Sequence, residues 1–103
     1  MRRAKLFIHG LAAGILAEQN KGGECTFSYL ADYQGEPISL TIPVGSLIST
    51  FPKFPPFLDG VLPEGAMLDA LLRQNKIDRD DNFSQLLAVG ADLVGAITVL
   101  EEP

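Results

Sequence analysis

Residues 5–18 read KLFIHGLAAGILAE, and this stretch decides the fold class. Apolar side chains recur at every second position on either side of the pair His9-Gly10, namely Leu6, Ile8, Ile15 and Ala17. A period of two is typical of a β-strand with one buried face, and a short break with turn formers is typical of a hairpin. The stretch therefore predicts two antiparallel strands.

The same alternation continues as far as Pro43. The apolar positions are Phe27 and Tyr29, followed by Ile38, Leu40 and Ile42. Turn formers at residues 20–23 and 34–37 separate these runs, and Pro43 ends the last one because it has no N–H to donate to a ladder. We expect four antiparallel strands between Lys5 and Pro43, with the aliphatic side chains of the last run on one face.

Beyond Pro43 the pattern changes from strands to helices. We expect an irregular connector over Gly45–Pro56 and a helix near Pro63–Gln74, with proline in its first turn. A second helix is expected over Asn82–Val89. The Asn82 side chain is expected to cap its first turn, with the Gln85 side chain making the reciprocal hydrogen bond of a capping box. Gly90 is expected to end the helix in a left-handed conformation. Residues 95–100 predict a last strand that returns to the sheet, and residues 101–103 a frayed end.

This order of elements predicts an α+β fold with two short helices on a mainly antiparallel sheet. The 103 residues and 47% hydrophobic content fit a single domain over residues 1–103. No apolar run approaches the roughly 20 residues of a membrane span, and the basic N-terminus is not followed by a leader-like apolar stretch. A net charge of −5 disfavours direct nucleic-acid binding, and the single cysteine fits a cytoplasmic protein without disulfides.

Candidate catalytic groups are few. His9 lies at a predicted turn, where an exposed imidazole is favoured over a general base, and Cys25 has no basic neighbour to activate its thiol. Asp78, Asp80 and Asp81 resemble an oxygen-rich metal loop, but a helix N-terminus explains them better. We predict no catalytic, cofactor-binding or metal-binding residues.

Two apolar segments are candidate interaction surfaces. The stripe Met67, Leu68, Leu71 and Leu72 is expected to face the core. The aromatic connector Phe51–Phe57 could close the core or stay partly exposed as an interface, and both interpretations remain open. Our candidate partner-binding residues are Phe54, Phe57 and Leu58, with Phe54 expected to be the exposed one because prolines flank it.

Two segments resemble a known family. They are Phe57-Leu58-Asp59-Gly60-Val61-Leu62-Pro63-Glu64-Gly65 and Gln85-Leu86-Leu87-Ala88-Val89-Gly90-Ala91-Asp92-Leu93-Val94-Gly95-Ala96-Ile97. In that order, after the run that ends in Pro43, they are similar to the signatures of the N-terminal subdomain of HipA-type serine/threonine kinases, the toxins of bacterial toxin–antitoxin systems. The resemblance covers nearly the whole chain, although Val61 stands where leucine is common.

The resemblance implies a role without catalysis, since the family's nucleotide loop and catalytic and magnesium-binding aspartates lie beyond this subdomain. Within the family, three-component systems pair a small HipS protein similar to this subdomain with a shortened kinase, HipT, and a helix-turn-helix DNA-binding protein, HipB. The resemblance therefore implies an antitoxin that binds and neutralises a HipT-type kinase, in a larger complex with a HipB-type protein. The alternatives are an N-terminal fragment of a full-length HipA-like kinase and, less favoured, a small metal- or ligand-binding enzyme.

Overall fold

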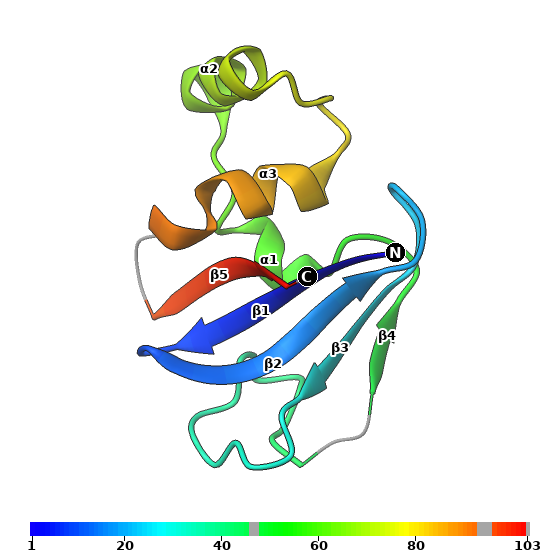
Figure 1. Ribbon diagram of the computed structural model, residues 1–103, viewed down its shortest axis with the longest axis vertical. Coiled ribbons are helices and arrows are strands. Elements are labelled where there is room, and N and C mark those ends of the chain that lie inside the picture. The colour runs from blue at the N-terminus through cyan, green and yellow to red at the C-terminus, as the bar shows by residue number, and fades with distance from the viewer. Residues whose placement is uncertain (46–47, 93–95, 103) are drawn as a thin grey trace.

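The chain is built on a five-stranded antiparallel sheet with strand order β4-β3-β2-β1-β5 among the described residues. The computed structural model describes residues 1–45, 48–92 and 96–102. The strands are β1 (Arg2–Ile8), β2 (Leu11–Glu18), β3 (Cys25–Tyr29), β4 (Ser49–Phe51) and β5 (Ile97–Glu102). Figure 1 shows helices α1 and α3 beside β5 and β1, and helix α2 farther from the sheet. The α+β prediction is confirmed.

The predicted hairpin of β1 and β2 is present and turns at His9 and Gly10. Both residues have positive φ, 50° and 81°, as the favoured two-residue hairpin turns require. The register shifts once, because Leu6 pairs with Gly14 whereas Phe7 pairs with Ala12. This irregularity leaves Ala13 as the extra residue of β2, and it is fully buried.

Gly14 has a packing role in the middle of β2. A Cβ atom at this position would lie 2.6 Å from the Phe27 ring, closer than real Cβ contacts come. Phe27 is itself fully buried in β3. Glycine at position 14 therefore makes room for the fully buried Phe27 ring.

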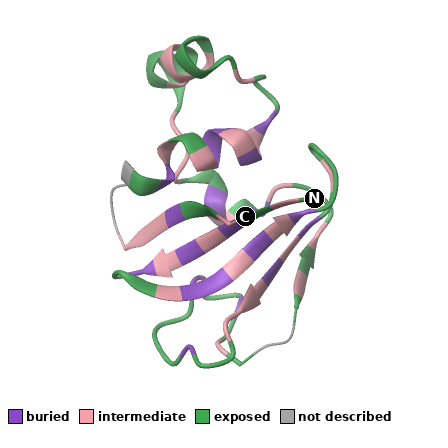
Figure 2. Cartoon of the chain, in the orientation of Figure 1, coloured by how far each residue is buried: buried purple, intermediate pink, exposed green. Residues whose placement is uncertain are grey.

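The core lies on one face of the sheet, beneath α1 (Pro56–Asp59), α3 (Asn82–Val89) and the segment 30–44. Figure 2 shows buried positions along the central strands and α3, and none on α2. The buried hydrophobic residues are Ala4, Leu6, Ile8, Ala13, Leu16, Cys25, Phe27, Tyr33, Ile38, Ile42, Leu58, Phe83, Leu86 and Val99. No helix among the described residues is long and apolar enough to cross a membrane.

The strand predicted over residues 38–42 is wrong. This segment makes only an isolated bridge between Ser39 and Ile42. Ile38 and Ile42 are buried, but their backbone groups bond to a side chain, because the Tyr29 hydroxyl donates to the Ile42 carbonyl (2.5 Å) and accepts from the Ile38 N–H (2.8 Å). Leu40 is 99% exposed, so the three aliphatics do not share a face.

The connector predicted over Gly45–Pro56 is only partly irregular. It contains β4, which supplies the fourth strand of the sheet, and its last residue begins α1. The next helix, α2 (Gly65–Asn75), begins two residues later than the prediction, with Glu64 rather than a residue before Pro63 as its N-cap.

Helix α3 has the predicted bounds but a different cap. The Asp81 side chain, not that of Asn82, accepts a hydrogen bond from the Ser84 N–H (3.2 Å). Gln85 does not return a bond to the cap, because its side-chain amide donates to the carbonyls of Asp78 (3.3 Å) and Arg79 (2.9 Å). The expected pair of Asn82 and Gln85 is therefore replaced by a network that also holds the turn before the helix.

The left-handed Gly90 predicted at the end of α3 is wrong. Its φ is −56°, and the chain continues into the 3₁₀ helix η1 (Gly90–Asp92). Glycine is needed for another reason, since a Cβ atom here would meet the Val99 carbonyl and lie 2.7 Å from the Val99 Cβ. The glycine lets the end of α3 pack directly on β5.

The last strand is longer than predicted at its C-terminal end. Glu101 and Glu102 pair with Ala4 and Arg3, so they belong to β5 and not to a frayed end. Gly95, the predicted first residue of this strand, lies outside the described residues, as does Pro103. The N-terminal and C-terminal strands are thus neighbours in the sheet.

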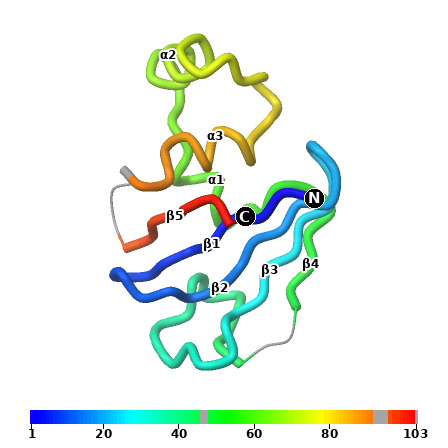
Figure 3. Tube along the Cα trace, viewed as in Figure 1, coloured from blue at the N-terminus to red at the C-terminus, as the bar shows by residue number. Residues whose placement is uncertain are grey.

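The apolar stripe of α2 does not face the core, contrary to the prediction. None of the eleven residues of this helix is buried, and Met67 is 74% exposed. Leu68, Leu71 and Leu72 are half-buried, yet they do not pack against the hydrophobic core. Figure 3 shows why, since the chain leaves the body after α1, forms α2 at one end of the molecule and returns to begin α3.

Candidate partner-binding surface

Phe54 lies in a groove where the chain leaves for α2 and returns from it. The cavity has a volume of about 500 Å³ and is lined by Glu18, Gly22, Lys53, Phe54, Asp59, Arg79, Asp80 and Asn82. Phe54 is half-buried and is the one large apolar side chain of this lining. Carboxylates and cations surround it, so the groove offers an aromatic contact within a charged rim.

The structure separates the three predicted partner-binding residues. Leu58 is fully buried in the core, and Phe57 is half-buried with its ring 5.9 Å from Phe27 in an edge-on contact. The Phe51 ring also lies 5.9 Å from the Phe57 ring, centroid to centroid. Phe54 is half-buried like Phe57 and also packs against the core, so it is not the exposed residue that we expected. Of the three it alone lines the groove, and its partner-binding role stays a prediction.

An ionic network joins one wall of the groove to the sheet. Arg2 donates through Nε to Glu18 (2.8 Å) and through its terminal nitrogens to Asp81 (2.9 Å) and Ser84 (2.6 Å). The guanidinium also lies over the Phe83 ring, 5.0 Å from its centroid. Arg2 therefore connects β1, β2 and the start of α3.

The charges of this network stabilise each other. Burial would raise the pKa of Asp81, but hydrogen bonds from Arg2 and Ser84 outweigh it and hold the pKa of that carboxyl below its usual value. Sequence reasoning missed this network, because its members are far apart in the chain. The only signal was a basic residue at the start of a strand and an acidic one before a helix.

The residues considered as catalytic or metal-binding candidates lie in environments that favour structural roles. Cys25 is fully buried, and burial is the main cause that raises the pKa of its thiol to about 11, away from thiolate reactivity. His9 is exposed at the hairpin turn, with its Nε2 atom 3.7 Å from the Glu36 carboxylate. Asp78 bonds to Lys21 (2.7 Å), while Asp81 caps α3. Within the described ranges, no three histidine, cysteine or acidic side chains converge as metal ligands do.

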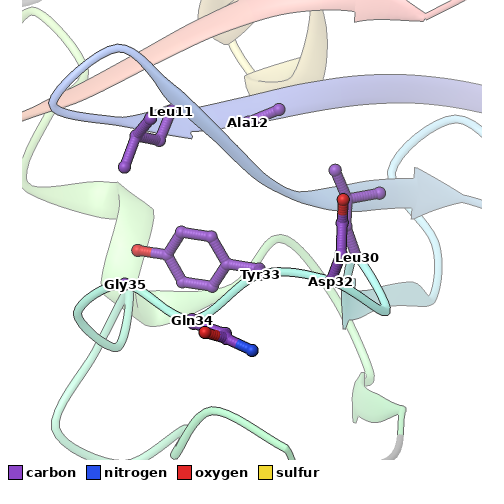
Figure 4. Close-up of a pocket in the computed structure, with 7 residues that line it drawn as sticks. All are labelled: Leu11, Ala12, Leu30, Asp32, Tyr33, Gln34 and Gly35. Carbon is purple, nitrogen blue, oxygen red and sulfur yellow. The ribbon is translucent and has the colours of Figure 1, made fainter.

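A second hollow lies beneath the start of β2. Its volume is about 490 Å³, and its lining is Leu11, Ala12, Leu30, Asp32, Tyr33, Gln34 and Gly35. Figure 4 shows the Tyr33 ring between Leu11 and Gln34. The Tyr33 hydroxyl donates to the Glu36 carbonyl (2.6 Å), and the ring stacks on Tyr29. This hollow presents one carboxylate and no nucleophile beside a base, so it offers no catalytic set.

The fold is that of a small α+β domain, and comparison with known proteins identifies its family. The family model of the HipA N-terminal domain matches residues 4–100, so the chain belongs to the HipA N-terminal domain family. A solved structure described as the N-terminal domain of HipA toxin is similar over 100% of this chain and 94% of that one, with a TM-score of 0.72 and 29% identity. The resemblance found in the sequence is confirmed.

Two relatives show the domain in chains of different length. An uncharacterized protein of Haemophilus influenzae is 33% identical over 102 residues, which cover 99% of this chain and 94% of the relative. A putative kinase of Sinorhizobium fredii, Y4dM, is 33% identical over 78 residues, which cover 70% of this chain and 19% of the kinase. The chain thus has a HipA-related role, and what is matched is the N-terminal domain and not a kinase catalytic domain.

Proposed function

We propose that the chain is a non-catalytic antitoxin that binds and neutralises a HipT-type serine/threonine kinase through protein–protein contact. The observation that carries the proposal is the match of residues 4–100 to the HipA N-terminal domain, a domain that in the putative kinase Y4dM is only part of a longer chain.

The relatives supply the nature of the partner. A homologous segment occupies about a fifth of the putative kinase Y4dM, where it is joined to the remainder of that chain. A domain of this family supplied as a separate chain keeps the surface that fits such a remainder. Binding neutralises the kinase if the bound state of the kinase is the incompetent one, because a ligand shifts an equilibrium toward the state it prefers. A HipB-type DNA-binding protein would complete the complex.

Titration against a shortened HipT-type kinase tests the proposal. We expect saturable binding in calorimetry with one chain per kinase, and loss of kinase autophosphorylation over the same concentration range. The chain alone should not hydrolyse ATP, because phosphoryl transfer needs magnesium ligands and the described residues hold no cluster of such side chains. Binding without loss of kinase activity would refute the antitoxin role, and ATP turnover that copurifies with the chain would refute the absence of catalysis.

The second candidate is the N-terminal part of a longer HipA-like kinase. It is favoured by the match to Y4dM, of which this chain spans only 19%. An antibody against the chain distinguishes the two on a blot of cells that carry the natural gene. A band near 11.1 kDa supports the separate antitoxin, whereas a band of several times that mass supports the longer kinase.

A further inference from the structure

Helix α2 is carried on an arm that leaves the body of the domain and returns to it. Val61 and Leu62 still pack against the hydrophobic core, and the chain is bonded to α3 again from Asp78 onward. We call residues 63–77, between these two points, the arm. None of the eleven residues of α2 is buried, and none packs against the hydrophobic core. Figure 3 shows the arm as a separate excursion of the chain at one end of the molecule.

The returning end of the arm is anchored by a buried side chain. Gln85 of α3 is 2% exposed, and its amide donates to the carbonyls of Asp78 (3.3 Å) and Arg79 (2.9 Å). The Asp81 N–H also donates to the Asp78 carbonyl (3.0 Å). Leaving a buried polar group without its partners is costly, so residues 78–81 stay on the body when the arm moves.

Backbone conformations at the two ends of α2 favour hinging there. Gly65, the first residue of the helix, has a φ of 59°, and without a Cβ atom it can change conformation at no steric cost. Lys76, the C-cap residue, has a left-handed φ of 54°, which costs energy in a residue with a Cβ atom. Release of the helix would relieve that cost. These two residues are the natural hinge positions of the arm.

One exposed ion pair closes the arm onto the anchored segment. Asp69 of α2 accepts a hydrogen bond from Arg79 (2.5 Å), and the two side chains are 53% and 67% exposed. Exposed ion pairs stabilise little and are screened by salt. Leu68, Leu71 and Leu72 are half-buried and α2 touches α3, so the arm also has a partial apolar contact. The closed position therefore depends on contacts that open at a lower cost than those of the buried core.

We propose that the arm opens as one hinged unit while the sheet, α1 and α3 stay folded. In the closed position Asp69 holds the Arg79 guanidinium, and Arg79 also lines the groove that contains Phe54. Opening frees this guanidinium at the groove. Lys53 is the one other cation among the described residues of that lining, so opening gives the groove a second available positive charge. The device belongs to the free chain and requires no kinase partner.

Native-state hydrogen exchange tests the arm in the free chain. The interior amides of α2, at Leu71, Leu72 and Arg73, should exchange at least about tenfold faster than those of Leu86 and Leu87 in α3. They should share one opening constant that depends weakly on urea, because opening exposes little apolar surface. Equal opening constants in α2 and α3 with equal urea dependence would overturn the proposal, because the arm would then open only when the whole domain unfolds. A gradient of rates from the ends of α2 to its middle would overturn it too, because the helix would then fray and not swing.

Matched variants test the ion pair that closes the arm. Asp69→Asn removes the carboxylate that holds Arg79, whereas Asp32→Asn removes an exposed carboxylate that makes no ion pair in the part of the chain that the structure describes. Relative to α3, Asp69→Asn should speed exchange of the α2 amides about two- to fivefold at 50 mM salt, and Asp32→Asn should not change it.

Salt gives a second reading of the same contact. Raising salt from 50 to about 500 mM should speed exchange of α2 relative to α3 in the wild-type chain, and less so in Asp69→Asn, because the screened charge is already absent there. An α2 rate that neither Asp69→Asn nor salt changes would overturn the assignment of Asp69 and Arg79 as the closing contact.

Discussion

Replacing Asp81 with alanine should destabilise the protein more than any other change of an acidic residue before α3. The carboxylate accepts bonds from the Ser84 N–H (3.2 Å), the Ser84 hydroxyl (2.7 Å) and Arg2 (2.9 Å). Loss of the helix cap costs about 1 kcal/mol. Loss of the charge-assisted hydrogen bond from Arg2 adds roughly 1–2 kcal/mol. This cost is modest because the Arg2 side chain is 31% exposed and keeps its bonds to Glu18.

The total of about 2–3 kcal/mol can be measured by urea denaturation at pH 7, and it corresponds to a melting temperature lower by roughly 10–20 °C for a domain of this size. Asp80→Ala is the matched control, since Asp80 is exposed and makes no ion pair among the described residues. It should stay within about 0.5 kcal/mol of wild type. Equal effects of the two changes would refute the capping and bridging role of Asp81.

The pH dependence of the same pair gives an independent check. The pKa of Asp81 is lower in the folded protein than its usual value, so its stabilisation is fully present above the unfolded pKa of about 4 and is lost as pH falls through the folded value. The difference in unfolding free energy between wild type and Asp81→Ala should therefore be constant from pH 5 to 7 and shrink below pH 4. If the difference in unfolding free energy between wild type and Asp81→Ala persists undiminished below pH 4, the charge of Asp81 contributes nothing to stability.

Three further predictions concern packing and reactivity. Gly90→Ala should lower the unfolding free energy in urea by about 1–3 kcal/mol, because the new methyl group meets the Val99 carbonyl, and an unchanged midpoint would contradict this contact. Leu58→Ala should lower the unfolding free energy by roughly 2–5 kcal/mol, because Leu58 is fully buried. Phe54→Ala should stay folded in circular dichroism melts and lose affinity for the kinase. Normal binding by Phe54→Ala would show that Phe54 is not part of the interface. Cys25 should react with a thiol reagent at pH 8 only at the rate of unfolding, and rapid labelling of the native chain would show that the thiol is accessible.

Sequence patterns predicted the elements that are stabilised by residues close to one another in the sequence. The alternation through β1 and β2 and the turn at His9-Gly10 were sufficient for the first hairpin, and the apolar spacing with flanking turn formers was sufficient for the bounds of α3. The segment 38–42 shows where such reasoning fails. Its alternation comes from two aliphatics buried beside Tyr29, whose hydroxyl takes the place of a neighbouring strand. The true fourth strand, Ser49–Phe51, is too short to show a period.

The candidate surface could be predicted only in part. Phe54 was expected to be exposed because prolines exclude it from a helix, but it is half-buried and packs against the core while it lines the groove. The stripe of α2 was recognised as apolar, but its direction depends on where the chain places the helix, which a period of 3.6 does not encode. The bridge from Arg2 to Asp81 joins residues 79 apart, and nothing in either neighbourhood marks the other as its partner.

The pairing of the first strand with the last has a consequence for synthesis on the ribosome. β1 lies between β2 and β5, and its second neighbour, β5, begins at Ile97. During translation the hairpin of β1 and β2 can form early, while the free edge of β1 and the apolar face beneath it wait for nearly the whole chain to emerge. Closing a loop of this length is slow, and an open strand edge invites pairing with other nascent chains. Chains interrupted before β5 would therefore be substrates for proteases and chaperones and not shorter forms of the domain.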